Sequence, residues 1–507
     1  MAKRKRDTAT TSTSRTGNST NGNDGASKVA KTNGHVDVKT TVPVIQIVAG
    51  SYERVLHGIT ASILNLSSSE SSPSVQFADT FLFNAHAGAV RCLALSPLPE
   101  QDSSENQGVY LATGGSDEKI NVFNLAASPV SENERLPPMP SLGKNTISEN
   151  PRNRELGTLL QHSSHITALH FPTRSKLLSS SEDNTIAITR LKDLAVVSTI
   201  KAPRPKVQGQ PSGDTAPPGG TPAGINDFSV HPSLKLMLTV GRGERCMRLW
   251  NLVTGKKAGV LNFNREILQS IREGKYSSGE GRRIRWSPDG SEFAVAFERG
   301  AVVFGEDSKP RCKVLPTPLT KLHQMCYVSL TRDGHREISL LAVSTEDGRI
   351  LFYLSETISA TNGIRNDQAD SSVPDATLIA TVGGRAAGTN TRIKDFEILF
   401  VQPTADEQNI MVIITASSDG TIRIIQVPLS SLCDRLEQKQ ELGSHLGTLV
   451  GVYETSNRIT CLKAFVMLPA KGDVESGELG NEDADFKGFD DTDGSDDSES
   501  SDVSGEL

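Results

Sequence analysis

A three-strand pattern that recurs along the chain is the feature that most constrains its fold. The pattern is clearest at residues 86–125, where apolar, largely alternating runs at 90–95, 110–113 and 120–125 are separated by turn residues. Such runs are typical of consecutive antiparallel strands. One unit of this kind cannot bury its own apolar face, so the fold depends on further copies that pack against it.

The pattern returns with the same landmarks further along the chain. In the second complete copy, His162 aligns with His86, Ile166 with Val90 and Asp183 with Asp117. Related runs follow as far as residue 427, and the segments 263–274 and 429–436 carry apolar residues at helical spacing. Counting from Val42 gives seven units, and the first of them lacks its innermost strand.

A segment near the end of the chain supplies the missing strand. The sequence ITCL at 459–462 aligns with VRCL at 90–93 and ITAL at 166–169. We therefore expect residues 458–468 to form the inner strand of the first unit and to close a ring, because closure removes the exposed edges that an open array would present. The predicted fold is an all-β, seven-bladed propeller that spans residues 42–471.

Composition divides the rest of the chain into insertions and tails. Polar, Pro- or Gly-rich stretches predict loop insertions at about 126–157, 202–224 and 355–391. Residues 1–41 are basic and rich in Ser and Thr, residues 472–507 are acidic, and neither segment has enough apolar residues to bury, which predicts disorder. The region between the two tails is near neutral, with a net charge of +1 over residues 43–472, which argues against a broad nucleic-acid-binding face and favours interaction tails.

Several classes of protein are disfavoured by what the sequence does not contain. No apolar run is long enough to predict a membrane span. The six cysteines never approach a C-x-x-C spacing, so we predict neither a disulfide framework nor a zinc site, and Cys92 and Cys461 are expected to pack on inner strands. Glycine-rich stretches such as GGSDEK and GRGERC match no phosphate-binding motif. We predict no cofactor and no metal.

The units resemble WD repeats, which begin near a Gly-His pair and end near Trp-Asp at a spacing of about 40–45 residues. Glu53 and Glu244 are acidic substitutes for the turn aspartate, while Phe123, Thr189, Tyr353 and Ile425 replace the tryptophan in other units. The resemblance implies a structural network within the blades, made of His86, Thr113, Asp117, His162, Ser179, Asp183, Trp250, Asp347 and Asp419.

A catalytic reading of the His–Asp pairs is less favoured than this structural one. The pairs His86/Asp117 and His162/Asp183 could be mistaken for acid–base dyads, but no nucleophile or third group recurs beside them. In a blade, the carboxylate instead satisfies the buried imidazole and nearby turn amides. We therefore expect a protein that is not an enzyme.

A more specific resemblance covers most of the predicted propeller. The segments AGSYERVLHGI, HAGAVRCLA, LTVGRGERCMRLWNLVTGKKA, ASSDGTIRI and RITCL look like the maintenance-of-killer protein eleven family of fungi, which is equated with the animal PAK-interacting WD-repeat protein. This resemblance implies a nucleolar assembly factor for the large (60S) ribosomal subunit, which binds pre-60S protein factors as a monomer within a large complex and contacts rRNA at most indirectly. It also implies an alternative role as a negative regulator that docks on a PAK-type kinase activated by Rac or Cdc42.

The remaining predictions concern a third binding role, the two tails and the location. A ubiquitin-ligase substrate receptor ranks last, because such receptors resemble W-D-x-R after the third strand, whereas residues 250–253 in this chain are WNLV. Lys3, Arg4, Lys5 and Arg6 form a candidate nuclear-import cluster, which could equally be a solvated charged terminus. The acidic tail either keeps the protein soluble or screens basic ribosomal proteins before assembly. The expected location is the nucleus and nucleolus.

Overall fold

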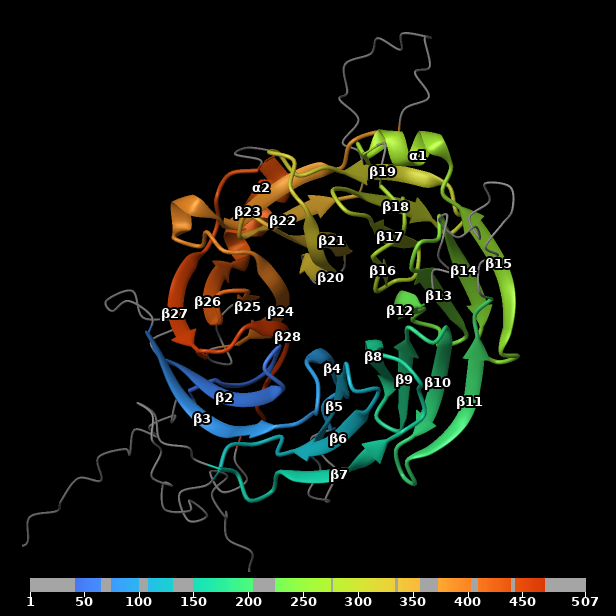
Figure 1. Cartoon of the computed structure of the whole chain (residues 1–507). Coiled ribbons are helices and arrows are strands. Elements are labelled where there is room, and N and C mark those ends of the chain that lie inside the picture. The colour runs from blue at the N-terminus through green and yellow to red at the C-terminus, as the bar shows by residue number, and fades with distance from the viewer. Residues whose placement is uncertain are drawn as a thin grey trace, which may run out of the picture. The chain divides into compact units, whose positions relative to one another are not determined.

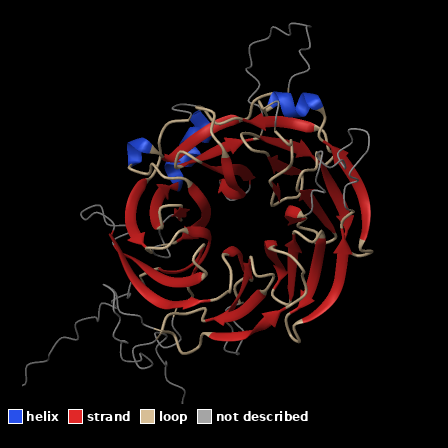
Figure 2. Ribbon diagram, in the orientation of Figure 1, coloured by secondary structure: helices blue, strands red, loops and turns tan. Residues whose placement is uncertain are grey.

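In the residues that it describes, the computed structural model shows a seven-bladed β-propeller with two short α-helices (Figures 1 and 2). The structure describes residues 42–64, 74–99, 108–130, 149–203, 224–274, 277–332, 336–355, 373–402, 409–438 and 443–469. The two predicted tails and the central parts of the predicted insertions lie outside these residues.

Each blade is a four-stranded antiparallel sheet whose strands follow one another from the ring centre outward. Blade 1 contains β28 (Ile459–Val466), β1 (Val44–Ser51), β2 (Val55–Leu64) and β3 (Ser74–Asn84). Blade 2 contains β4 (Val90–Leu95), β5 (Val109–Gly115), β6 (Ile120–Leu125) and β7 (Arg154–Leu159). Blade 3 contains β8 (Ile166–Thr173), β9 (Lys176–Ser181), β10 (Thr185–Arg190) and β11 (Ala195–Lys201).

The remaining four blades follow the same order. Blade 4 contains β12 (Ile225–Val230), β13 (Leu236–Gly241), β14 (Cys246–Asn251) and β15 (Lys256–Asn262). Blade 5 contains β16 (Arg283–Trp286), β17 (Glu292–Ala296), β18 (Ala301–Gly305) and β19 (Pro310–Val314). Blade 6 contains β20 (Leu322–Arg332), β21 (Arg336–Thr345), β22 (Arg349–Leu354) and β23 (Thr377–Gly383). Blade 7 contains β24 (Ile393–Val401), β25 (Ile410–Ser417), β26 (Thr421–Pro428) and β27 (Thr448–Glu454).

The predicted closure of the ring is confirmed. Strand β28 pairs with β1 from Ile45–Val466 to Ser51–Ile459, so the last strand along the chain completes the first sheet. Figure 1 shows this red strand beside the blue strands of the amino-terminal part. The pairing leaves neither β28 nor β1 with an exposed edge at the seam.

The apolar core lies between the blades rather than within a single centre. Seven clusters of buried side chains each combine residues from two adjacent blades, and together they run around the whole ring. A fully buried Leu, Ile or Phe side chain contributes about 1.5–3 kcal/mol relative to an exposed one. Each blade therefore depends for its stability on both of its neighbours.

One helix connects two blades, and the other lies within blade 7. Helix α1 (Arg265–Ser270) follows β15, and Asn264 caps it by accepting a hydrogen bond from the Ile267 N–H at 2.9 Å. Helix α2 (Leu429–Gln438) connects β26 to β27, and its completely buried Leu432 packs in the cluster between blades 6 and 7. Neither helix is long and apolar enough to cross a membrane.

Two outer strands overlap ranges that the sequence predicts as loops. Strand β7 begins at Arg154, within the predicted insertion 126–157, and β23 lies entirely within the predicted insertion 355–391. The first five residues of β7 are half-buried or exposed, because an outer strand has only one neighbour in its sheet and little apolar surface to bury. Strand β23 differs, because Ile379, Ala380 and Val382 are buried, and the predicted loop is simply too long at its carboxyl end.

Candidate functional site

Blade 2 contains a buried chain of hydrogen bonds centred on His86. Its Nδ1 lies 3.0 Å from Asp117 Oδ1, and its Nε2 lies 2.8 Å from Thr113 Oγ1. Asp117 also accepts a hydrogen bond from the Ala87 N–H at 2.9 Å. Burial lowers the pKa of His86 despite the opposing effect of Asp117, which favours a neutral ring that donates to Asp117 and accepts from Thr113.

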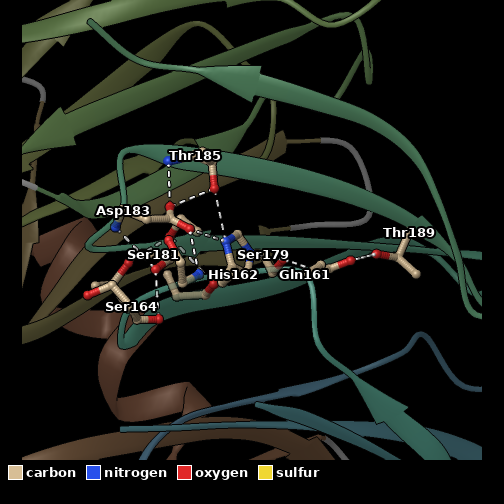
Figure 3. Close-up of polar contacts among 12 residues, drawn as sticks. Gln161, His162, Ser164, Ser179, Ser181, Asp183, Thr185 and Thr189 are labelled. Atoms are coloured by element: carbon tan, nitrogen blue, oxygen red, sulfur yellow. Dashed lines mark hydrogen bonds and ion pairs between the residues drawn. The ribbon is translucent and has the colours of Figure 1, made fainter. Parts of the chain in front are cut away.

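Blade 3 has a longer version of this network (Figure 3). The ring nitrogens of His162 lie 3.1 Å from Asp183 Oδ2 and 2.8 Å from Ser179 Oγ. Asp183 also accepts from the Thr185 hydroxyl at 2.6 Å and from the Ser163 N–H at 3.1 Å. Burial opposes ionisation of Asp183, but the hydrogen bonds from His162, Thr185 and Ser163 outweigh it and lower its pKa to about 2.

A glutamine that was not predicted from the sequence extends the blade 3 network. Gln161 Nε2 donates to Ser179 Oγ at 2.8 Å, and Gln161 Oε1 accepts from the Thr189 hydroxyl at 2.8 Å. In blade 4, Trp250 Nε1 donates to Thr239 Oγ1 at 2.9 Å. The Gln161 amide therefore supplies in blade 3 the donor that the Trp250 indole supplies in blade 4. The only feature of the sequence that could have indicated Gln161 is its position directly before His162.

The other predicted turn acids have local partners that differ from blade to blade. Glu244 is buried with Arg248, whose Nη2 lies 3.0 Å from Glu244 Oε1. Asp347 accepts from Arg349 Nε at 2.8 Å, and Asp419 accepts from Thr421 Oγ1 at 2.6 Å. The structure therefore places each predicted network residue in the contacts of its own blade, without bringing the blades' networks together.

A second network spans the seam between blades 7 and 1 and was not predicted. His57 Nε2 lies 2.9 Å from Asp79 Oδ1, and the Tyr453 hydroxyl donates to the same carboxylate. All three side chains are buried. Tyr453 is far from His57 in sequence, so no local pattern could have indicated the contact. Glu53 adds a tie at this seam by accepting from the Arg458 N–H at 2.9 Å.

These buried networks leave little chemistry available to a substrate. Both nitrogens of His86 and His162 already have partners within hydrogen-bonding distance, and neither ring adjoins a free nucleophile in the described blades. Cys92 and Cys461 lie on inner strands, and burial raises the pKa of the Cys92 thiol to about 12. The described residues contain no cluster of His, Cys, Asp or Glu suited to a metal ion.

The central channel is lined by charged residues that do not belong to the buried networks of the blades. In six of the seven inner strands, all except β16, the pairing with the next strand is interrupted next to the strand's first residue. A bulge of this kind re-aims the extra side chain. Arg91, Thr167, Lys394 and Thr460 occupy four of these positions, and all four line a cavity of about 490 Å³ in the channel.

Two aspartates tie neighbouring inner strands together along the channel wall. Asp227 Oδ2 accepts from the Ile284 N–H at 3.1 Å and from Arg285 Nη1 at 2.7 Å. Asp395 Oδ2 likewise accepts from the Leu462 N–H of the next blade at 3.0 Å. Both carboxylates are buried, so their hydrogen bonds across the blade boundary stabilise the inner ring.

A further ion pair lies deeper in the same channel. Lys463 Nζ lies 2.5 Å from Glu397 Oε2, and the negative charges of Glu397 and Asp395 outweigh the effect of burial and raise the pKa of Lys463. Arg285 and Lys463 also line a second cavity of about 240 Å³. The channel is therefore wide enough for water and is lined by charges of both signs.

Cations collect at the end of the channel where the inner strands begin. We call this end the channel mouth, and its cations are Arg282, Arg283, Lys321, Arg392, Lys394 and Arg458. The mouth also holds His323, whose pKa is lowered to about 4 by burial and then by Lys394, Arg392, Arg282 and Arg283. Burial, Arg392 and Arg458 likewise lower the pKa of Lys394. The mouth therefore has a positive potential.

Comparison with known proteins agrees with this architecture. The family model described as "WD domain, G-beta repeat" matches residues 153–189, which include β7 and the network of blade 3. Over 420 residues, the chain is 25% identical to p21-activated protein kinase-interacting protein 1-like of Danio rerio, an alignment that covers 82% of this chain and 80% of that protein.

Fungal relatives match a similar part of the chain. Protein MAK11 of Saccharomyces cerevisiae is 25% identical over 434 residues, which cover 82% of each protein. Shk1 kinase-binding protein 15 of Schizosaccharomyces pombe is 26% identical over 309 residues, which cover 61% of this chain and 68% of that protein. The chain is thus a WD-repeat protein related, over about four fifths of its length, to Protein MAK11 and the p21-activated protein kinase-interacting protein 1-like proteins.

Proposed function

We propose that this protein is a non-catalytic scaffold in the nucleolar assembly of the large ribosomal subunit. The observation that carries the proposal is its similarity to Protein MAK11, which extends over 82% of both chains. The buried position of the blade networks supports the non-catalytic part, because these residues serve the fold and leave the rims and channel for protein partners. It acts as a monomer that holds protein factors of the precursor particle.

Affinity purification from cells tests this function directly. A tagged copy expressed at its natural level is expected to recover precursor rRNA of the large subunit together with protein assembly factors. Depletion of the protein is expected to reduce free large subunits in a sucrose gradient without an equal loss of small subunits. Recovery of neither rRNA nor assembly factors, together with normal subunit profiles, would overturn the proposal.

The basic cluster at the amino terminus gives the location its own test. Lys3, Arg4, Lys5 and Arg6 lie outside the described residues and form a candidate import signal. Replacing all four by alanine is expected to move a fluorescently tagged protein from the nucleus toward the cytoplasm. The matched control replaces Lys28, Lys31 and Lys39 of the same segment and is expected to leave nuclear accumulation unchanged.

The names of several relatives favour regulation of a protein kinase as a second candidate function. Relatives from Danio rerio and Gallus gallus are named p21-activated protein kinase-interacting proteins, and a relative from Schizosaccharomyces pombe is named a Shk1 kinase-binding protein. In this alternative, the protein docks on the regulatory region of such a kinase and inhibits it. Purified protein is then expected to bind and inhibit the activated kinase, and a saturating amount with no effect on either assay would remove this candidate.

A further inference from the structure

The mouth cations come from four adjacent blades and are only partly neutralised. Glu298 forms ion pairs with Lys321 at 2.8 Å and with Arg282 at 3.9 Å, while Glu346 pairs with Arg392 at 2.6 Å. These carboxylates lie in the turns that follow β17 and β21. They account for half of the cations and leave the group with an excess of positive charge.

The other three cations have no ion pair within the described part of the chain. Arg283 Nε donates only to the His323 carbonyl, at 3.4 Å, and the Arg458 guanidinium lies 5.8 Å from the centre of the Tyr52 ring. Lys394 is half-buried and forms neither a hydrogen bond nor an ion pair with any described residue. The charge of Lys394 is costly to leave uncompensated, because burial removes part of its hydration, whereas Arg458 is exposed.

Two of these unpaired cations face a cavity rather than open solvent. Arg283 and Lys394 line the channel cavity of about 490 Å³ together with Arg91. This volume lies within the range of about 300–1,000 Å³ that is usual for pockets that bind ligands. The lowered pKa values of His323 and Lys394 are consistent with positive charge held together at this point. The mouth therefore combines charge, space and unused donors.

The surroundings favour a carboxylate side chain over a nucleic-acid backbone. Glu298 and Glu346 lie among the mouth cations, Glu182 pairs with Arg91 of the same cavity, and the propeller as a whole is near neutral. A polyphosphate chain gains affinity from a broad basic face, which this rim does not offer. An extended peptide can instead direct one or two carboxylates into a narrow opening while its backbone stays outside.

We propose that the channel mouth binds an acidic peptide segment of a protein partner, with its Asp or Glu carboxylates seated between Arg283, Lys394 and Arg458. The contacts would be charge-assisted hydrogen bonds, which are stronger than neutral ones. This inference deepens the proposed scaffold function and rests on it only in taking the partner to be a protein. Peptide binding is measured without a ribosomal particle, so it can fail or succeed separately from that function.

The test uses the full chain and a fluorescein-labelled hexaglutamate peptide as the probe, followed by fluorescence polarisation. We expect saturable binding that weakens with salt, and no binding of a hexaglutamine peptide. Lys394→Glu places a carboxylate where the proposal seats that of the partner, and it is expected to weaken binding by about tenfold or more. Lys394→Arg keeps the charge and is expected to retain binding.

Lys309→Glu is the matched control because it makes the same change in charge elsewhere. Lys309 is 82% exposed and pairs with Asp307 in the turn between β18 and β19, whereas Glu298 of the mouth lies at the other end of β18. This variant is expected to bind the probe as the wild type does. The proposal is overturned by no saturable binding to the wild type, by equal losses in Lys309→Glu and Lys394→Glu, or by tighter Lys394-dependent binding of a polyuridine RNA.

Discussion

At the scale of single residues, the carboxylate of Asp183 is the best-supported source of stability within a blade. It accepts hydrogen bonds from His162, Thr185 and Ser163, and 7% of its side-chain surface is exposed. These donors outweigh burial and lower its pKa from the ordinary 3.8 to about 2. A carboxylate whose pKa is lower in the folded state stabilises the fold above its unfolded pKa.

Asp183→Asn is therefore expected to reduce the free energy of unfolding at pH 7 by about 2 kcal/mol. In the wild type, this contribution falls to about half at pH 3 and disappears below pH 2, so the variant and the wild type converge on acidification. Urea denaturation at pH 7 and pH 3 measures the difference. Asp193→Asn, which removes an exposed partner of Arg190, is the control and should change stability little. A pH-independent difference for Asp183→Asn would contradict the assignment.

Lys394 provides the opposite case, because the fold disfavours its charge. Burial and the arginines around it lower its pKa below the ordinary 10.5, so the protonated form destabilises the folded state at neutral pH. We expect Lys394→Met, which keeps most of the apolar stem, to raise the melting temperature at pH 7, and the gain to shrink as the pH approaches that of lysine deprotonation. Differential scanning fluorimetry from pH 7 to pH 10 tests this, with Lys309→Met as the control. A lower melting temperature would show that Lys394 has a stabilising partner.

At the scale of strands and sheets, β27 and the outer part of blade 1 share one buried carboxylate in addition to their apolar packing. Tyr453 of β27 donates to Asp79 of β3, and His57 of β2 lies 2.9 Å from the same carboxylate. The His57 and Tyr453 rings also meet edge-on at 5.7 Å. These contacts join two sheets whose strands are far apart in sequence.

Tyr453→Phe is expected to lower the free energy of unfolding by about 1–3 kcal/mol, because it removes a donor from a buried acceptor. Chemical denaturation at neutral pH gives this value. Tyr52→Phe is the control, since Tyr52 is 61% exposed and Phe keeps the ring beside Arg458. Equal stability of Tyr453→Phe and the wild type would mean that the hydroxyl contributes nothing at the seam.

At this scale, how well a strand can be predicted from the sequence depends on its place in the blade. The inner and middle strands were predictable, because they pack on two neighbours and carry regular apolar residues, as in β4 and β5. The outer strands β7 and β23 overlap predicted loops for different reasons. The residues of β7 are mostly exposed or half-buried, whereas β23 is apolar and partly buried but is preceded by a long polar segment that extends the predicted loop. The channel site was also missed. A bulge at Lys394 turns its side chain into the channel. The alternation of apolar and polar residues along β24 does not reveal such a bulge, so it could not predict this orientation.

At the scale of the whole molecule, the repeat pattern predicts the His–Asp networks and the closure of the ring, but it does not predict contacts between repeats. His86 and Asp117 lie within one repeat, so their spacing alone suggests contact, and the structure places them 3.0 Å apart. The match of ITCL to VRCL was enough to predict closure by β28, because each inner strand occupies an equivalent place in its blade. Contacts between repeats, such as Tyr453 with Asp79, leave no such periodic signal.

The closing strand contributes to two of the seven interblade clusters. Ile459, Leu462 and Ala464 pack between blades 7 and 1, while Cys461, Phe465 and Met467 pack between blades 1 and 2. Leu462 is completely buried and Phe465 is 6% exposed. The backbone of β28 also pairs with β1 from Ile45 to Ser51. Strand β28 is therefore a structural part of both blade boundaries.

Truncation after Asn457 is for these reasons expected to unfold the ring, whereas truncation after Gly472 removes only residues outside the propeller. Loss of a buried Leu, Ile or Phe side chain costs about 2–5 kcal/mol, so three of them alone approach the 5–15 kcal/mol by which a typical protein is stable. Circular dichroism melting curves of the two truncated proteins and the full chain test this. The shorter protein should lose its cooperative transition, and the longer one should melt with the full chain. Leu462→Ala should fall between them, since it leaves the pairing of β28 with β1 intact but creates a cavity between blades 7 and 1. Equal melting of both truncated proteins would mean that the other five blade boundaries hold the ring together without its closing strand.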